Sequence, residues 1–316
     1  MKKYSICIPA YKSLFLKESI ESVLNQKYLN YELIILNDDS PQPVEKIVDS
    51  ISSSKIKYYK NTINVGAKNL VHNWNKCLSY CTGDYIVIMG DDDSLEPNYL
   101  EEFNLLIDRY PDLDVYHCRS KIIDEESNPI MLTPSWPEFE TVYDCIWHRI
   151  TERRSQYISD FVYKISTLRE KDGFYDLPLA WGSDDISAFL ACSKKGIAHT
   201  NKPVFNYRSN SLSITSSGQP LIKMESNLIY ESWLKGFLVN VPSDENEKIV
   251  YNDICKNFTK YMQARKIYVM INSMSKQPFR NFMMWYTNRK VYNINILEIG
   301  FSLLNSFKRQ IARNIY

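Results

Sequence analysis

Residues 83–93 read GDYIVIMGDDD, an apolar run followed at once by a glycine and three adjacent aspartates. A short apolar run bounded by turn residues is typical of a buried strand. Neighbouring carboxylates repel one another, but a hard cation such as Mg²⁺ or Mn²⁺ binds them and shares its remaining positions with water and phosphate. The stretch therefore predicts a strand that carries Asp91, Asp92 and Asp93 to a metal site. The alternative is a solvated acidic turn that caps a helix starting near Pro97.

The sequence before this stretch alternates between two hydrophobic periods. Apolar runs that predict further strands occupy residues 4–9, 31–36 and 56–59. Apolar residues at helical spacing predict helices at 16–27, 44–51, 70–78 and 99–107. Such alternation, with nearly continuous apolar strands, favours a mostly parallel sheet covered by helices. The expected fold class is therefore α/β, with a Rossmann-like sheet.

Polar residues follow the predicted strands at the points where a ligand is expected. Ligands of parallel sheets bind beyond the carboxyl ends of the strands, which lie along one edge. The first strand ends in Pro9, Ala10 and Tyr11, and Asp38 and Asp39 follow the second. The acidic pair could hydrogen-bond a nucleoside or simply close a turn. We expect both groups to lie near the three aspartates.

The segment NVGAKN, residues 64–69, is a candidate phosphate-binding helix start. Gly66 permits close approach of a ligand to the backbone, and free N–H groups at a helix N-terminus attract anions. A single glycine is weak evidence without the neighbouring groups. We include Asn64, Gly66, Lys68 and Asn69 among the candidate nucleotide-binding residues.

Two later motifs add candidates for catalysis. In WGSDD, residues 181–185, Asp184 and Asp185 open a helix and could act as a general base or merely cap the helix. In NYRSN, residues 206–210, Arg208 could bind a diphosphate with two parallel hydrogen bonds. An arginine in such a place also commonly forms a surface ion pair.

Composition excludes some classes of function and bounds others. The chain has 316 residues and a formal net charge of +1, so no overall field indicates nucleic acid as a partner. Seven scattered cysteines without a zinc-site spacing are interpreted as reduced thiols, which favours a cytoplasmic protein. Neither a signal peptide nor a transmembrane helix is predicted. A change in composition, to helical segments rich in Lys, Asn, Tyr and Met, divides the expected catalytic domain, residues 1–220, from a helical extension, residues 221–316.

The extension contains apolar and basic residues at mixed spacing, as in residues 279–286 and 301–313. One interpretation is a helical extension that packs on the catalytic domain. The other is a surface that contacts an anionic membrane or a lipid-linked acceptor, at the inner face of the plasma membrane.

Taken in order, the motifs IPAYK, LIILNDDS, NVGAKN, GDYIVIMGDDD, WGSDD and NYRSNSLS resemble those of the inverting family 2 glycosyltransferases. Each motif is weak alone, but their order and spacing over residues 4–215 are specific. The resemblance implies the fold known as GT-A. It also implies a nucleoside site at Pro9–Tyr11 and Asp38–Asp39, and a general base at Asp184 or Asp185.

The same resemblance implies that Asp92 binds Mn²⁺ or Mg²⁺ together with the donor diphosphate, with Asp91 and Asp93 in support. This sequence departs from the commoner form Leu-Asp-x-Asp-Asp, because Gly90 stands where that form has its first aspartate. A serine and an asparagine follow Arg208, where some members have a histidine. Both departures concern contacts with the diphosphate.

The hypothesis is hexosyl transfer from a nucleotide-diphosphate sugar, with uridine as the favoured base, to a hydroxyl of a glycan or lipid-linked acceptor in bacterial surface polysaccharide synthesis. A nucleotidyltransferase is disfavoured because the first loop lacks glycine, and a receiver domain because it would need far fewer residues. A catalytically silent nucleotide-sugar-binding or assembly protein of the same fold is the alternative.

Overall fold

The structure is a computed structural model that describes residues 1–210 and 219–315. The chain forms two compact units, Met1–Asp176 with Ser183–Ser213 and Leu177–Gly182 with Ile214–Tyr316. Residues Leu177–Gly182 belong to the second unit. The division predicted at residue 220 had placed them in the first.

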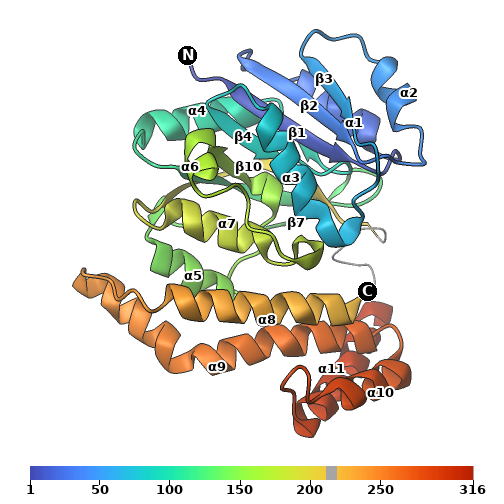
Figure 1. Ribbon diagram of the computed structural model, residues 1–316, viewed down its shortest axis with the longest axis vertical. Helices are drawn as coiled ribbons and strands as arrows, with labels where there is room; N and C mark the ends of the chain where they lie inside the picture. The colour runs from blue at the N-terminus through green and yellow to red at the C-terminus, as the bar shows by residue number, and fades with distance from the viewer. Residues whose placement is uncertain (211–218, 316) are drawn as a thin grey trace. The chain divides into compact units, whose positions relative to one another are not determined.

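The first unit is built on a curled sheet, to which ten strands of the described residues contribute (Figure 1). Its parallel part has the order β3-β2-β1-β4, formed by β3 (Ile56–Lys60), β2 (Tyr31–Asn37), β1 (Tyr4–Ala10) and β4 (Tyr85–Ile88). The antiparallel strand β9 (Phe161–Lys164) joins β4 to β6 (Val115–Ile123), and β10 (Ile197–Arg208) runs parallel to β6. Three short antiparallel strands complete it: β5 (Ser94–Leu95), β7 (Pro129–Leu132) and β8 (Phe139–Glu140). The predicted α/β class is confirmed.

Helices cover both faces of the sheet because successive side chains of a buried strand point in opposite directions. Ile6 and Ile8 of β1 belong to the core beneath α1 (Leu16–Leu24), α2 (Val44–Asp49) and α4 (Tyr99–Arg109). Cys7, between them, contacts Cys81 at the end of α3 (Leu70–Tyr80) on the opposite face, with 3.5 Å between the sulfurs. This unit also contains the α-helices α5 (Val142–Ile150), α6 (Ile165–Glu170) and α7 (Ser183–Cys192).

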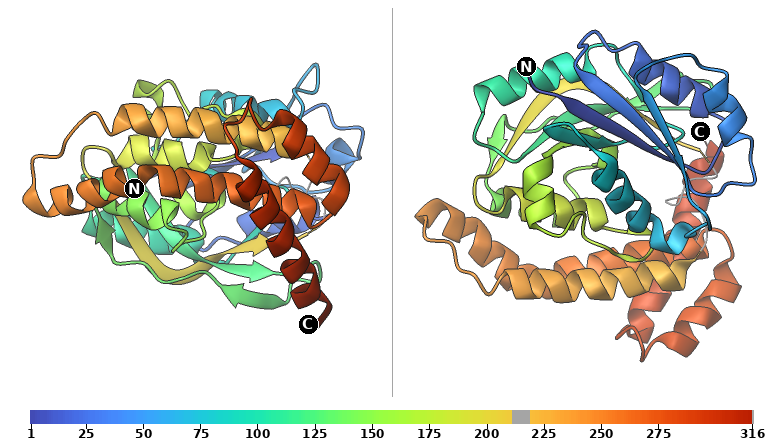
Figure 2. Two further views of the ribbon diagram at one scale, coloured as in Figure 1. Left: turned by 90° about the horizontal axis from the view of Figure 1, so that it is seen from below. Right: turned by 45° about the horizontal axis from the view of Figure 1, so that its top comes forward.

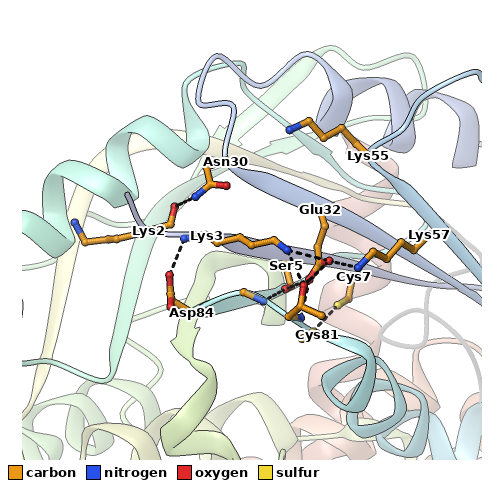
Figure 3. A network of polar contacts seen from close by, with 12 residues as sticks. Lys2, Lys3, Ser5, Cys7, Asn30, Glu32, Lys55, Lys57, Cys81 and Asp84 are labelled. Atoms are coloured by element: carbon orange, nitrogen blue, oxygen red, sulfur yellow. Dashed lines mark hydrogen bonds and ion pairs between the residues drawn. The ribbon is translucent and has the colours of Figure 1, made fainter.

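A buried carboxylate joins the parallel strands near their amino ends (Figure 3). Glu32 of β2 accepts hydrogen bonds from the Ser5 hydroxyl of β1 (2.6 Å), the Lys57 ammonium of β3 (2.6 Å) and the Thr82 backbone N–H (2.7 Å). Burial opposes its charge, but these donors outweigh burial and lower the pKa of Glu32 to about 2. The network fixes the three strands whose carboxyl ends carry the candidate site.

The second unit is helical, as the sequence predicted for this part of the chain. It contains the 3₁₀ helix η3 (Pro178–Ala180) and the helices α8 (Pro220–Phe237), α9 (Glu245–Met274), α10 (Pro278–Asn288) and α11 (Ile296–Ile315). Helices α8 and α9 lie side by side (Figure 2), and Met224, Met270 and Trp285 form part of a separate core. Among the described residues, no helix is both long and apolar enough to cross a membrane.

Candidate active site

The loop after β4 lies against the loop after β1. Asp91 Oδ2 accepts hydrogen bonds from the backbone N–H groups of Tyr11 (2.8 Å) and Lys12 (2.6 Å). Burial and the neighbouring charge of Asp92 raise the pKa of Asp91 to about 6, although Lys12 and the two N–H groups oppose this shift. Asp91 therefore holds together two loops that the parallel pairing of β1 with β4 brings to one edge.

Asp93 also points into the protein. Its Oδ1 accepts the backbone N–H of Arg208 (2.9 Å), and its carbonyl oxygen accepts the hydroxyl of Ser19 (2.7 Å). Burial, followed by the charge of Asp92, raises the pKa of Asp93 well above its ordinary value. Asp93 thus ties the acidic loop to β10 and α1.

Asp92 is the partly exposed member of the three aspartates. Its Oδ2 accepts hydrogen bonds from the ammonium of Lys12 (2.8 Å) and the side-chain amide of Asn210 (2.8 Å). Burial disfavours the charge of Lys12, but Asp92 and Asp91 outweigh it and raise the pKa of Lys12. Of the three carboxylates, Asp92 is therefore the one placed to meet a ligand.

Gly90 leaves room for the carboxylates that follow it. A Cβ atom at this position would lie 2.7 Å from Asp93 Oδ2 and 3.0 Å from Asp92 Oδ1. Both distances are shorter than ordinary van der Waals contact, so a side chain here would displace one of the two aspartates. The glycine is explained by this close approach.

The donor atoms at Asp92 suit a divalent cation whose other ligands come from phosphate and water. In the described part of the chain, no three His, Cys, Asp or Glu side chains gather into a metal site. Mg²⁺ at phosphate sites commonly uses only one or two carboxylates. Oδ1 of Asp92 accepts no hydrogen bond from the described residues, whereas Oδ2 already holds the Lys12 ammonium. These residues fit one divalent cation whose remaining ligands come from a diphosphate and water. The Lys12 ammonium is a second positive charge beside that site.

Asp38 organises the loop after β3. Its Oδ1 accepts the amide of Asn61 (2.7 Å) and the backbone N–H of Val65 (3.0 Å), and its backbone carbonyl accepts the amide of Asn64 (2.6 Å). Its own N–H donates to Ala10 at the end of β1 (3.0 Å). Asp38 is buried and therefore supports the loop after β3 from inside the protein.

Several of the other predicted nucleotide-binding residues are exposed or partly exposed, whereas Ala10 at the end of β1 is buried. Tyr11 is 43 % exposed, and Asp39 is partly exposed, 3.7 Å from the ammonium of Lys60. Gly66 has a φ of +76°, a backbone conformation that favours glycine. Asn64, Lys68 and Asn69 are exposed around the short 3₁₀ helix Ala67–Asn69. The structure thus brings the ends of β1, β2 and β4 together, as predicted, and places the 64–69 loop next to Asp38.

The two aspartates at the start of α7 occupy different environments. Asp185 is fully buried, and its Oδ1 accepts hydrogen bonds from Arg149 Nε (2.6 Å) and from the Gln156 amide (2.8 Å). Asp184 is partly exposed. Asp185 is therefore enclosed by the protein and already paired with an arginine of the chain itself. Asp184 is the better candidate for a group that exchanges a proton with a substrate.

Comparison with protein families matches residues 5–169 to Glycosyl transferase family 2. This match covers more than half of the chain. The chain belongs to glycosyl transferase family 2. The matched residues of this family 2 chain include the ends of β1, β2 and β4 and all three aspartates.

Curated relatives carry related descriptions. The putative glycosyltransferase EpsE of Bacillus subtilis is 35 % identical over 127 residues, which cover 39 % of this chain and 45 % of EpsE. The Escherichia coli protein named UDP-Glc:alpha-D-GlcNAc-diphosphoundecaprenol beta-1,3-glucosyltransferase WfgD is 36 % identical over 98 residues, 31 % of this chain and 38 % of WfgD. The chain spans less than half the length of these relatives.

Solved structures share the fold over nearly the whole family 2 chain. S. aureus TarS 1–349, in complex with UDP-GlcNAc, has a TM-score of 0.62 at 15 % identity and covers 99 % of this chain and 91 % of its own. The mannosyltransferase PcManGT from Pyrobaculum calidifontis, in complex with GDP-Man and Mn²⁺, has a TM-score of 0.57 at 11 % identity, covering 98 % and 87 %. The expected GT-A fold is confirmed.

Arg208 lies at the end of β10, beside the acidic loop of this family 2 chain. Its guanidinium is buried and donates to the carbonyl of Asp92 (2.8 Å), the hydroxyl of Ser127 (2.9 Å) and the carboxylate of Glu18 (2.7 Å). It also lies over the ring of Phe15, 4.3 Å from its centroid. In the described structure these donors are directed to internal acceptors that hold the acidic loop, and the contact of Arg208 with a diphosphate stays a prediction.

Two residues that contact Asp92 were not among the sequence-based candidates. Lys12 is the last residue of the motif IPAYK, directly after Tyr11, and Asn210 follows Arg208 by two residues. For Lys12 a signal was present, because a cation after β1 lies at the same sheet edge as the carboxylates after β4. No signal identified Asn210, whose contact with Asp92 joins residues 118 positions apart.

Proposed function

We propose that the protein is an inverting glycosyltransferase that uses a nucleotide-diphosphate sugar, with uridine as its base. The acceptor is a hydroxyl of a glycan or a lipid-linked glycan, in the synthesis of a bacterial capsule, O-antigen or exopolysaccharide. The observation that carries the proposal is the cluster at one sheet edge, where Asp92 faces outward while Asp38 and Asp91 fix the surrounding loops. TarS bound to UDP-GlcNAc and the name of WfgD support the donor class.

Donor binding is assigned to the residues after β1, β2 and β3. Tyr11 and Asp39 would contact the nucleoside, and the backbone around Gly66 would approach it. Asp92 would hold Mn²⁺ or Mg²⁺, which neutralises negative charge on the diphosphate when it is bound. Lys12 adds a positive charge at the same place and would stabilise the departing diphosphate.

Acceptor activation is assigned to Asp184. As the acceptor hydroxyl attacks the anomeric carbon, Asp184 would take its proton, and the bond to the diphosphate would break on the opposite face. A single displacement of this kind inverts the configuration of the sugar. Asp185, paired with Arg149, would keep the start of α7 in place.

The first test measures thermal unfolding with UDP, GDP and their sugars, with and without Mn²⁺. A ligand that binds only the folded state raises the melting temperature by mass action. We expect a shift with a uridine nucleotide that is lost in Asp92→Ala. A shift with another base alone would reject uridine, and no shift with any nucleotide would reject the proposed donor class.

The second test follows sugar release and transfer in Asp184→Asn and Asp185→Asn. We expect Asp184→Asn to keep the nucleotide-dependent thermal shift and to lose transfer by about two orders of magnitude or more. Transfer within a few-fold of the wild type would exclude Asp184 as the base. Donor binding without hydrolysis or transfer under any condition would favour the silent nucleotide-sugar-binding protein.

A further inference from the structure

Helix α11 exposes a regular apolar stripe. Leu297, Phe301 and Leu304 are 80 %, 54 % and 66 % exposed, and their spacing of four and three residues places them on one side of the helix. Ser302 and Ser306, by contrast, are fully buried. A surface helix that only packs on a core buries its apolar side and exposes its polar side. On α11 this arrangement is therefore partly reversed, because apolar side chains are exposed and serines are buried.

Helix α10 repeats the pattern next to it. Phe279 is 74 % exposed, Met283 58 % and Tyr286 37 %, again at spacings of four and three residues. The two helices pack against each other, and the ring of Phe279 lies 6.4 Å from that of Phe307. Single exposed apolar residues are ordinary, but two adjacent stripes indicate a surface with an apolar partner. We call these six side chains, three from each helix, the apolar face.

The segment of the chain that carries the apolar face is strongly biased in charge. Residues 276–316 contain seven lysines and arginines but a single acidic residue, Glu298, although the whole chain has a net charge of only +1. Lys308 extends the stripe of α11, four residues after Leu304. Lys290 is exposed just after α10. Within the described residues, neither of these two lysines has an acidic partner.

We propose that the apolar face docks on an anionic lipid bilayer, with α10 and α11 lying in the plane of its surface. Amphipathic helices with apolar side chains flanked by lysine and arginine bind such interfaces through buried apolar area and attraction to anionic headgroups. The excess of cations favours this occupant over a second copy, because a symmetric interface would bring the exposed Lys290 and Lys308 of two copies together. The docking does not depend on sugar transfer.

The test is sedimentation of the full chain with vesicles of phosphatidylcholine alone or with about 30 % phosphatidylglycerol. We expect binding to the anionic vesicles, weakened by added salt, and at least about tenfold weaker binding for Leu304→Asp. The matched control is Leu105→Asp on α4, since Leu105 is also exposed, at 63 %. It should bind like the wild type.

A second variant, Lys308→Gln, keeps the apolar face and should weaken binding to anionic vesicles only. Equal loss of binding in Leu304→Asp and Leu105→Asp, or no binding of the wild type, would overturn the proposal. The proposal would also be overturned if the wild type does not bind vesicles and light scattering shows a dimer that Leu304→Asp dissociates. Circular dichroism melting identifies a variant that has lost its fold, and nucleotide-dependent thermal shifts report the donor site independently.

Discussion

Replacing Lys12 by methionine should tighten binding of Mn²⁺ in the absence of nucleotide. The Lys12 ammonium lies 2.8 Å from Asp92 Oδ2, and the two side chains are 27 % and 14 % exposed. Exposed ion pairs contribute about 0.2–1 kcal/mol and hydrogen bonds between charged groups about 1.5–3 kcal/mol. A partly buried pair falls between them, so removal of the competing cation is expected to be worth about 1.4 kcal/mol, or a tenfold change in affinity.

The assay is electron paramagnetic resonance of free Mn²⁺ during titration with the protein. Lys17→Met is the matched control, because Lys17 is exposed on α1 and pairs with Glu21 instead. Asp92→Asn should remove binding in both backgrounds. An affinity of Lys12→Met within about twofold of the wild type would refute competition at Asp92, whereas persistence of binding in Asp92→Asn would refute the metal site itself.

Three further changes test the packing and charge of the first unit. Gly90→Ala should lower the unfolding free energy by about 1–3 kcal/mol through overpacking against Asp93, measured by urea denaturation. Lys57→Met should move acid unfolding to higher pH. Glu32, with a folded pKa of about 2 and an ordinary value of 4.5, stabilises the fold above pH 4.5 and loses this effect as pH falls towards 2. Asp160→Asn should flatten the loss of stability between pH 4 and 8, because burial raises the pKa of Asp160 from 3.8 to about 8.

Each change has an outcome that contradicts its physical reason. Unchanged stability of Gly90→Ala would mean that the acidic loop yields without cost. An acid midpoint of Lys57→Met at or below that of the wild type would show that Lys57 does not support the charge of Glu32. Parallel pH profiles of Asp160→Asn and wild type would place the pKa of Asp160 near its ordinary value.

The parallel half of the sheet could be predicted because β1, β2 and β4 are covered on both faces and are therefore apolar throughout. The half of the sheet that contains β6 and β10 could not be predicted in this way. Strand β10 has exposed residues and register shifts between Thr200 and Phe205, which interrupt its apolar pattern. Strand β6 contains His117, whose ring is buried and stacks on Trp136 at 3.8 Å between centroids. A polar residue that packs in this way has no local signature.

The convergence of the site followed from strand order, but the task of each side chain did not. Three adjacent aspartates are equivalent in the sequence. Their difference arises from partners far along the chain, since Asp93 meets the backbone of Arg208 while Asp92 meets Lys12. The same holds for α7, where Arg149 of α5 distinguishes Asp185 from Asp184.

Asp91 has a consequence for engineering the donor specificity of this chain. Asp91 accepts hydrogen bonds from the backbone of Tyr11 and Lys12 and so joins the loop after β1 and the acidic loop into one structural unit. A loop exchanged between homologues to alter the nucleoside would keep its shape only if its new backbone still presented two N–H groups to that carboxylate. Successful transplants should therefore carry both loops together, and a transplant of either one alone should lose order in the other.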